Sequence, residues 1–393
     1  MSSSKPLALL GGKPRIDRSE WPSWPPRGPA IIAALATVAN KDEWGIHSAA
    51  VSHFETAFAH HHDAEFGLAM ANGTVALYCA LAAAGVGRGD EVIVPAYTFM
   101  ATAAAVLQCG ATPVLADIDP LTFNLDPAAA AAAISGKTRA VMPVHIGGNP
   151  ADMEAFKQLG EKHNIVIIED AAQAPGAIYG GKKVGALGNV GCFSFQSSKN
   201  MTAGEGGILL TNDESLYRRA FELYNCGRTT TGPWYEHLSP GLNLRLSAFQ
   251  AAILQVQLQR LEADADKREA NGRYLEEQLN EIDGLQCAGR YQQTGRNAYH
   301  LLIFTYDAKA FSGLPKAKFL EALMAEGVVA TDGYRPLQSL PFIKHDGGGL
   351  PVTDRLCRDQ VWLRQFELLA GRPLLERAVQ AIRDIQEQAH LLV

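Results

Sequence analysis

The chain has 393 residues, of which 47% are hydrophobic and 19% are charged, and its formal net charge is −6 at pH 7. This composition is typical of a globular protein, and the length predicts one large domain with a second, smaller one. The negative charge and the lack of runs of like charge argue against nucleic acid or an anionic membrane as the main partner. No apolar run approaches the roughly 20 residues of a membrane-spanning helix, so we expect no membrane segment.

Residues 1–30 are rich in proline, glycine and tryptophan, which predicts an irregular arm rather than a helix. The arm has no long apolar stretch, so we do not expect a signal peptide. The six cysteines are scattered, without a C-x-x-C motif or histidines at zinc-ligand spacing. They indicate reduced thiols in a cytoplasmic protein.

The next segment predicts a helix over residues 50–59, because Val51, Phe54 and Phe58 recur at helical spacing. The three histidines that follow, His60 to His62, suggest a metal site at first sight. Consecutive residues of a helix point in different directions, however, and three neighbours rarely bind one ion. We therefore expect no metal.

A regular alternation of helices and strands follows. Helices are predicted over residues 74–84, 98–108, 127–134 and 151–163, and strands over residues 91–94, 112–116, 139–144 and 165–168. Such alternation predicts an α/β fold with a mainly parallel central sheet and helices on both faces. The glycines of GVGRG, residues 85–89, come after a helix and before a strand, which is the reverse of a dinucleotide-binding loop, so they predict a simple turn.

Residues 247–282 carry apolar side chains at helical spacing without a proline, which predicts one long helix. The pattern beyond it is mixed, with a strand in AYHLLIFTYD and a helix after it, and indicates a smaller α+β domain. We therefore expect an N-terminal arm at 1–30, a large domain at 31–255 and a smaller C-terminal domain at 256–393.

Polar, acidic and aromatic residues follow the predicted strands, where ligands bind in a parallel sheet. Gly73 and Thr74 open a helix, and such an N-terminus either binds a phosphate or is simply capped. Asp170 ends a strand, where an acid ligates a metal, acts as a base, holds a protonated ring nitrogen or caps a turn. Phe99 follows another strand and either stacks on a flat ligand or fills core.

The stretch CFSFQSSKNMTAGEGG contains a single lysine, Lys199, which follows a predicted buried strand. It is either a solvated loop cation or an amine that forms a Schiff base with an aldehyde. The glycines after it allow a sharp turn into a strand over residues 208–211.

Together these blocks resemble the DegT/DnrJ/EryC1 family of pyridoxal 5′-phosphate (PLP)-dependent sugar aminotransferases of fold type I. The likeness extends over nearly the whole chain, because blocks in the family's order and spacing include NGTVAL, PAYTFMAT, VLADIDPLTFNLDP, PVHIGGNPADM, IIEDAAQAPGA, CFSFQSSKNMTAGEGG and GLNLRLSAFQAAILQVQL. The resemblance implies an aminotransferase with PLP as its cofactor.

The resemblance also implies a role for individual residues. Lys199 would carry PLP as a Schiff base and Asp170 would pair with its pyridine nitrogen. Asn243 would reach the phosphate from a second subunit, which implies a homodimer with shared active sites. The remaining cofactor contacts would be Gly73, Thr74 and Ser194 at the phosphate, Phe99 stacked on the ring, and Gln173 beside the phenolic oxygen.

Relatives with histidine at the lysine position dehydrate sugars, so Lys199 favours transamination. The opening LALLGGKPRIDRSEWPSWPP and Gln173 are most similar to the subgroup with scyllo-inosose aminotransferases and 3-amino-5-hydroxybenzoate synthases. The resemblance therefore implies L-glutamine or L-glutamate as amino donor and a keto-sugar or keto-cyclitol as acceptor, for an aminosugar, an aminocyclitol or a related secondary metabolite such as an antibiotic.

Several alternatives stay open at this point. One is a nucleotide-linked keto-sugar aminotransferase of surface polysaccharide synthesis, and another is a PLP enzyme that dehydrates or aromatises its substrate. A dinucleotide oxidoreductase lacks its glycine fingerprint, and the intact Lys199 and Asp170 argue against a non-catalytic regulator. Residues that would face the substrate, each with an alternative role in packing or a turn, are Trp44, His47, His145 and Tyr334.

Overall fold

A seven-stranded sheet lies at the centre of the large part of the fold. The computed structural model describes residues 5–45, 48–233, 235–345 and 348–393. The strand order is β1-β9-β8-β5-β4-β2-β3. The pairs β8–β5, β5–β4, β4–β2 and β2–β3 are parallel, and β9 runs antiparallel to both of its neighbours. The prediction of a mainly parallel sheet is confirmed. The strands are β1 (Phe66–Met70), β2 (Glu91–Pro95), β3 (Thr112–Ala116), β4 (Thr138–Val141), β5 (Val166–Asp170), β8 (Val190–Ser194) and β9 (Gly207–Thr211).

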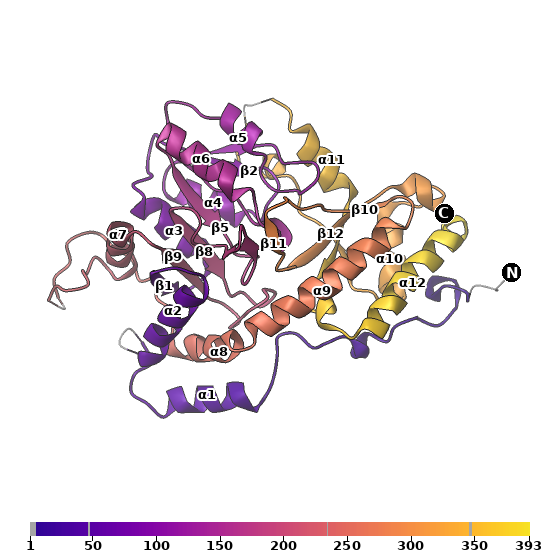
Figure 1. The fold of residues 1–393 in the computed structure, drawn as a ribbon, viewed down its shortest axis with the longest axis horizontal. Helices are drawn as coiled ribbons and strands as arrows, with labels where there is room; N and C mark the ends of the chain where they lie inside the picture. The colour runs from indigo at the N-terminus through magenta and orange to yellow at the C-terminus, as the bar shows by residue number, and fades with distance from the viewer. Residues whose placement is uncertain (1–4, 46–47, 234, 346–347) are drawn as a thin grey trace.

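Helices cover both faces of this sheet, as predicted (Figure 1). One face packs against α2 (Ala49–His61), α5 (Pro127–Ala132), α6 (Met153–His163) and α8 (Ala248–Leu258). The other face packs against α3 (Gly73–Ala83), α4 (Ala101–Gln108) and α7 (Glu214–Tyr224). The helix expected from residue 98 begins three residues later, so Thr98 lies in the turn before α4.

A second, four-stranded antiparallel sheet has the order β10-β12-β14-β13. Together with its helices it confirms the smaller α+β part of the fold. Its strands are β10 (Leu285–Cys287), β12 (Leu301–Tyr306), β13 (Ala330–Asp332) and β14 (Gln360–Arg364), and its helices include α10 (Lys316–Ala325), α11 (Pro351–Asp359) and α12 (Arg372–Gln388). A three-stranded sheet joins β11 (Thr294–Arg296) to β6 (Ile178–Tyr179) and β7 (Lys182–Lys183).

The single long helix expected over residues 247–282 is wrong. The chain forms α8 and then α9 (Leu261–Asn280), with Gln259 and Arg260 between them. Near the end of α8 the buried side chain of Gln257 accepts from the backbone N–H of Thr202 at 3.0 Å and donates to the Thr202 carbonyl. The helix is thus interrupted close to Gln257, the residue that binds α8 to the loop after Lys199.

The N-terminal arm packs against the C-terminal part of the chain before it reaches α1 (Pro29–Ala39). Leu7, Ile16 and Trp21 are buried in one apolar cluster with residues of α9, α10 and α12. The Trp21 indole donates to the Gly327 carbonyl at 2.8 Å. In Figure 1 the indigo arm runs beneath α9 toward α1.

In the described part of the chain, no helix combines the length and the apolar character needed to cross a membrane.

Candidate active site

The N-terminus of α3 lies against the end of β8. The Asn72 side chain caps the helix by accepting from the Val75 N–H at 3.0 Å, while Gly73 and Thr74 have no intrahelical partner for their own N–H groups. A methyl group at Gly73 would come within 2.7 Å of the Ser194 Cβ atom. Glycine thus lets the helix end approach Ser194, and the two form a place suited to an anion.

Asp170 is a buried carboxylate at the carboxyl end of β5. Its Oδ2 accepts from the Thr102 hydroxyl at 2.8 Å, and its Oδ1 accepts from the Ala172 N–H at 3.2 Å. Burial raises the pKa of Asp170, while these two hydrogen bonds and the charge of Lys199 act in the opposite direction. Burial therefore makes an isolated carboxylate unfavourable here, and a positively charged partner would stabilise it.

Lys199 lies in the loop after β8 with its side chain half-buried. Burial lowers the pKa of its amine from 10.5 to about 8, although the nearby Asp170 carboxylate favours the charged form. A larger fraction of this amine is neutral near pH 8 than for an ordinary lysine, as a nucleophilic amine requires.

Contacts on both sides of Lys199 fix its loop. The next residue, Asn200, donates to the Ala298 carbonyl at 2.6 Å, and its side-chain oxygen lies 3.2 Å from the Nδ1 atom of His300. From the arm, the Trp24 indole donates to the Ser197 carbonyl at 3.1 Å. The loop thus contacts distant segments at both ends of the sequence.

Gln173 and Tyr334 meet near Asp170. The Gln173 Oε1 atom accepts from the Gly147 N–H at 2.8 Å, and Nε2 donates to the Tyr334 hydroxyl at 3.4 Å. Burial and the charge of Asp170 raise the pKa of Tyr334. The ring of Phe99, which is 52% exposed, lies 6.2 Å from the Tyr334 ring and is free to cover a flat ligand.

Two other residues expected to face the substrate make hydrogen bonds within the chain. His145 is fully buried, with its Nε2 atom 3.0 Å from Glu169 and its Nδ1 atom accepting from the Ala151 N–H at 3.0 Å. These contacts leave neither ring nitrogen for a substrate, so the expectation for His145 is corrected to a packing role. The Trp44 indole donates to the Val38 carbonyl at 3.1 Å and its ring packs edge-on against Phe249, yet the residue is 54% exposed. Its contact with a substrate stays a prediction.

His47 lies outside the described residues. Asn243 is exposed and forms an isolated β-bridge with Asn225. The expectation that it reaches the phosphate of another subunit stays a prediction.

Sequence reasoning missed Thr102, Asn200 and His300. Thr102 follows Thr98 by four residues, and their hydroxyl oxygens lie 3.1 Å apart. That spacing within PAYTFMAT is the one signal that could have pointed to Thr102. Nothing local in the sequence could have linked Asn200 to His300, because they are 100 positions apart.

Comparison with known proteins identifies the group to which this site belongs. The sequence pattern of the DegT/DnrJ/EryC1/StrS aminotransferase family matches residues 27–382. The chain belongs to this family. It is an aminotransferase, and its cofactor is PLP.

Relatives with full-length similarity include members of the subgroup expected from the sequence. The 3-amino-5-hydroxybenzoate synthase of Amycolatopsis mediterranei is 36% identical over 94% of this aminotransferase and 98% of its own chain. The L-glutamine:scyllo-inosose aminotransferase of Streptomyces griseus is 35% identical over 96% of this chain and 93% of its own. A crystal structure of 3-amino-5-hydroxybenzoic acid synthase superposes with a TM-score of 0.88 at 35% identity, over 94% of this chain and 99% of the other.

The residues gathered at the carboxyl edge of the sheet fit PLP. They offer a half-buried amine whose Nζ atom makes no hydrogen bond within the described ranges, a buried acid, and a helix N-terminus that glycine keeps open. These groups suit an aldehyde, a basic ring nitrogen and a phosphate, which are the three functional parts of PLP.

Proposed function

We propose that this aminotransferase moves the amino group of L-glutamine or L-glutamate to a cyclic ketone, a keto-cyclitol or keto-sugar, in the biosynthesis of an aminocyclitol, an aminosugar or a related secondary metabolite. The observation that carries the proposal is the pairing of Lys199, whose pKa is lowered to about 8, with the buried Asp170 at one edge of the sheet. The names of the relatives, which include a glutamine:scyllo-inosose aminotransferase, support a cyclic acceptor.

In this proposal Lys199 binds PLP covalently and later moves a proton. When bound, PLP supplies an electron sink that makes a proton on the adjacent substrate carbon removable. With a pKa of about 8, the Lys199 Nζ atom can both accept and return a proton near neutral pH. Its half-buried position limits exchange of that proton with water.

Asp170 would hold the ring nitrogen of PLP. The Thr102 hydroxyl and the Ala172 N–H bind one carboxylate oxygen each and fix the plane of the group. Burial disfavours the isolated anion, so a positive ring nitrogen beside it is strongly favoured. Gln173, whose oxygen is occupied by the Gly147 N–H, would direct its amide N–H toward the phenolic oxygen.

The phosphate would bind where α3 meets β8. Gly73 and Thr74 offer backbone N–H groups and the positive end of the helix, and Ser194 offers its hydroxyl. The exposed Asn243 would complete the phosphate site of a second subunit. Our proposal therefore includes a homodimer with shared sites.

Phe99 would stack on the cofactor ring, and Tyr334 would face the substrate. Both lie at the sheet edge that holds Lys199, and Phe99 is exposed enough to contact a ligand. The six cysteines are all free, which supports the cytoplasm as the compartment.

Two half-reactions test the proposal. The purified protein should show the visible absorbance of bound PLP, lose it on addition of glutamine or glutamate, and regain it with the correct ketone. Lys199→Ala should abolish both changes, whereas Lys182→Ala, which removes an exposed lysine, should not. Transamination that survives Lys199→Ala, or a purified protein without PLP, would refute the proposed function.

A second candidate is dehydration and aromatisation of a ring that already carries its amino group, to a product of the 3-amino-5-hydroxybenzoate type. It is favoured by the TM-score of 0.88 to the synthase of that acid. Product analysis separates the two candidates. An aromatic product absorbs ultraviolet light and forms without an added amino donor. An aminocyclitol lacks this absorbance and forms only when an amino donor is added.

A further inference from the structure

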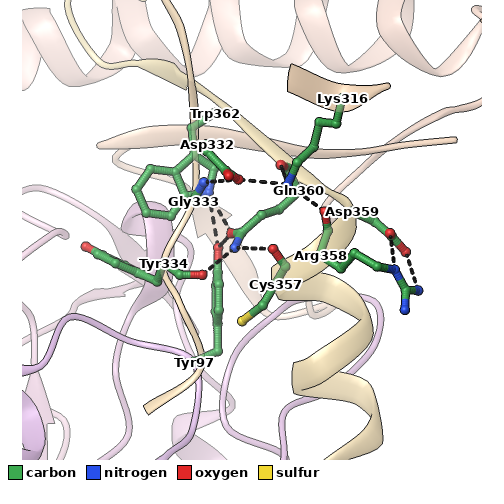
Figure 2. Close-up of polar contacts among 10 residues, drawn as sticks. All are labelled: Tyr97, Lys316, Asp332, Gly333, Tyr334, Cys357, Arg358, Asp359, Gln360 and Trp362. Atoms are coloured by element: carbon green, nitrogen blue, oxygen red, sulfur yellow. Dashed lines mark hydrogen bonds and ion pairs between the residues drawn. The ribbon is translucent and has the colours of Figure 1, made fainter. Parts of the chain in front are cut away.

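Gln360 lies at the centre of a buried polar cluster between the two sheets (Figure 2). It begins β14 and is fully buried. Its Nε2 atom donates to the carbonyls of Tyr334 at 2.7 Å and Cys357 at 3.2 Å. Its Oε1 atom accepts from the Trp362 indole at 3.0 Å and from the Tyr97 hydroxyl. All four hydrogen-bonding positions of the amide are therefore used.

The cluster joins the large sheet to the small one. Tyr97 lies two residues beyond β2 of the central sheet, whereas Gln360 and Trp362 belong to β14. The Tyr97 hydroxyl also accepts from the Trp362 indole at 3.1 Å. Since a fully satisfied buried network resists rearrangement, this junction is rigid.

The same cluster fixes the segment that carries Tyr334. A methyl group at Gly333 would meet the Gln360 side chain at 1.9 Å, so the amide lies directly on this backbone. The Tyr334 ring packs edge-on against Trp362, with centroids 4.5 Å apart, and lies 5.8 Å from the Tyr97 ring. Both the backbone and the ring of Tyr334 are thus held by residues of the cluster.

Tyr334 in turn orients Gln173. The Gly147 N–H fixes the oxygen of the Gln173 amide, and the Tyr334 hydroxyl accepts one of its two N–H groups at 3.4 Å. The second N–H has no partner in the described segments and is available to a ligand oxygen.

We infer that Gln360 is a positioning residue that acts through Tyr334 on the Gln173 amide, and so sets the hydrogen bond that the site offers to a ligand oxygen. This inference rests on the proposed function, in which Gln173 lies beside the phenolic oxygen of PLP. Residues of both sheets would thereby set the strength of the hydrogen bond to the phenolic oxygen, although Gln360 does not contact the cofactor.

The test is a pH titration of the visible absorbance of bound PLP in the wild-type protein and in five variants. Gln360→Met keeps the length of the side chain and removes its amide, and Tyr334→Phe removes the hydroxyl at the other end of the chain of contacts. A weaker donor stabilises an anionic oxygen less, so each variant should move the titration midpoint to higher pH by roughly 0.5 to 1 pH unit, the size expected for one hydrogen bond. The double variant should move it no further, because both changes act along one path.

Thr353→Val serves as the matched control. Thr353 is fully buried and its hydroxyl donates to Asp117 at 2.7 Å, another contact between the two parts of the fold. Its loss should lower the melting temperature about as much as Gln360→Met does and leave the titration midpoint unchanged. Tyr97→Phe, which removes only a hydroxyl, should give a smaller shift in the direction of Gln360→Met and replaces it if that variant does not fold.

Two results would overturn the inference alone: a Gln360→Met protein with a lower melting temperature and an unchanged midpoint, or shifts that add in the double variant. A wild-type protein without the absorbance of bound PLP would overturn the proposed function as well.

Discussion

Replacement of Lys199 by methionine should stabilise the PLP-free protein. Burial lowers the pKa of this amine from 10.5 to about 8, and each factor of ten in proton affinity corresponds to about 1.4 kcal/mol. At pH 7 the folded, PLP-free protein therefore holds a charged amine at a cost of about 3 kcal/mol relative to the unfolded chain. Methionine has a similar length and no charge, so Lys199→Met should raise the free energy of unfolding by about that amount.

The sign of the pH dependence follows from a folded-state pKa that lies below the unfolded value. The cost is complete below pH 8, shrinks as the pH rises from 8 to 10.5, and vanishes above the unfolded pKa. At pH 9.5 the advantage of methionine should thus fall to about 1.5 kcal/mol.

Urea unfolding of the PLP-free proteins, followed by tryptophan fluorescence at pH 7 and pH 9.5, measures both values. Lys182→Met provides the control, because this lysine is exposed and its replacement should change stability by less than about 0.5 kcal/mol at either pH. The reasoning fails if Lys199→Met gives no stabilisation at pH 7, or the same stabilisation at both pH values.

Thr102→Val removes the hydroxyl that donates to Asp170, and PLP affinity measured by equilibrium dialysis should fall about ten- to a hundredfold; Thr102→Ser keeps the donor, and equal affinities for the two variants would contradict this role. Gly73→Ala would bring a methyl group within 2.7 Å of the Ser194 Cβ atom, which should cost about 1–3 kcal/mol in urea unfolding; an unchanged midpoint would show that the two elements move apart easily. Glu169→Ala leaves one buried and two partly buried backbone N–H groups without their acceptor. It should cost about 3 kcal/mol in the same assay, whereas a much smaller loss would indicate that other groups replace the carboxylate.

The sequence predicted the parallel part of the central sheet because its strands and helices each carry a clear local period. It did not predict that β9 runs antiparallel. The connection from Ser194 to Gly207 contains no helix that could cross over a face of the sheet, and a parallel neighbour needs such a crossover. The break after α8 escaped prediction for a different reason: Gln257 is tied to Thr202, a contact between distant residues that leaves no trace in helical spacing.

The resemblance in the sequence pointed to Lys199, Asp170 and Gln173, and the structure brings these three residues to one edge of the sheet. The position of His145 after a strand predicts that it lies at this edge, but the end of a strand does not specify the direction of a side chain. The structure turns it toward Glu169. Gln360 could not be found from sequence, since its role depends on the approach of two sheets.

The docking of the arm has a consequence for the order in which the protein is completed during synthesis. The Glu326 side chain accepts from the Ala8 N–H at 2.7 Å, across 318 positions of the sequence. At roughly 5–20 residues per second, the ribosome needs tens of seconds to add the residues between these two partners. Trp24 follows this docked segment and donates to the Ser197 carbonyl, so we expect the contact between the arm and the loop of Lys199 to form after Glu326 has been made. Until then Leu7, Ile16 and Trp21 lack the cluster that buries them in the folded protein, so we expect the newly made arm to expose apolar surface.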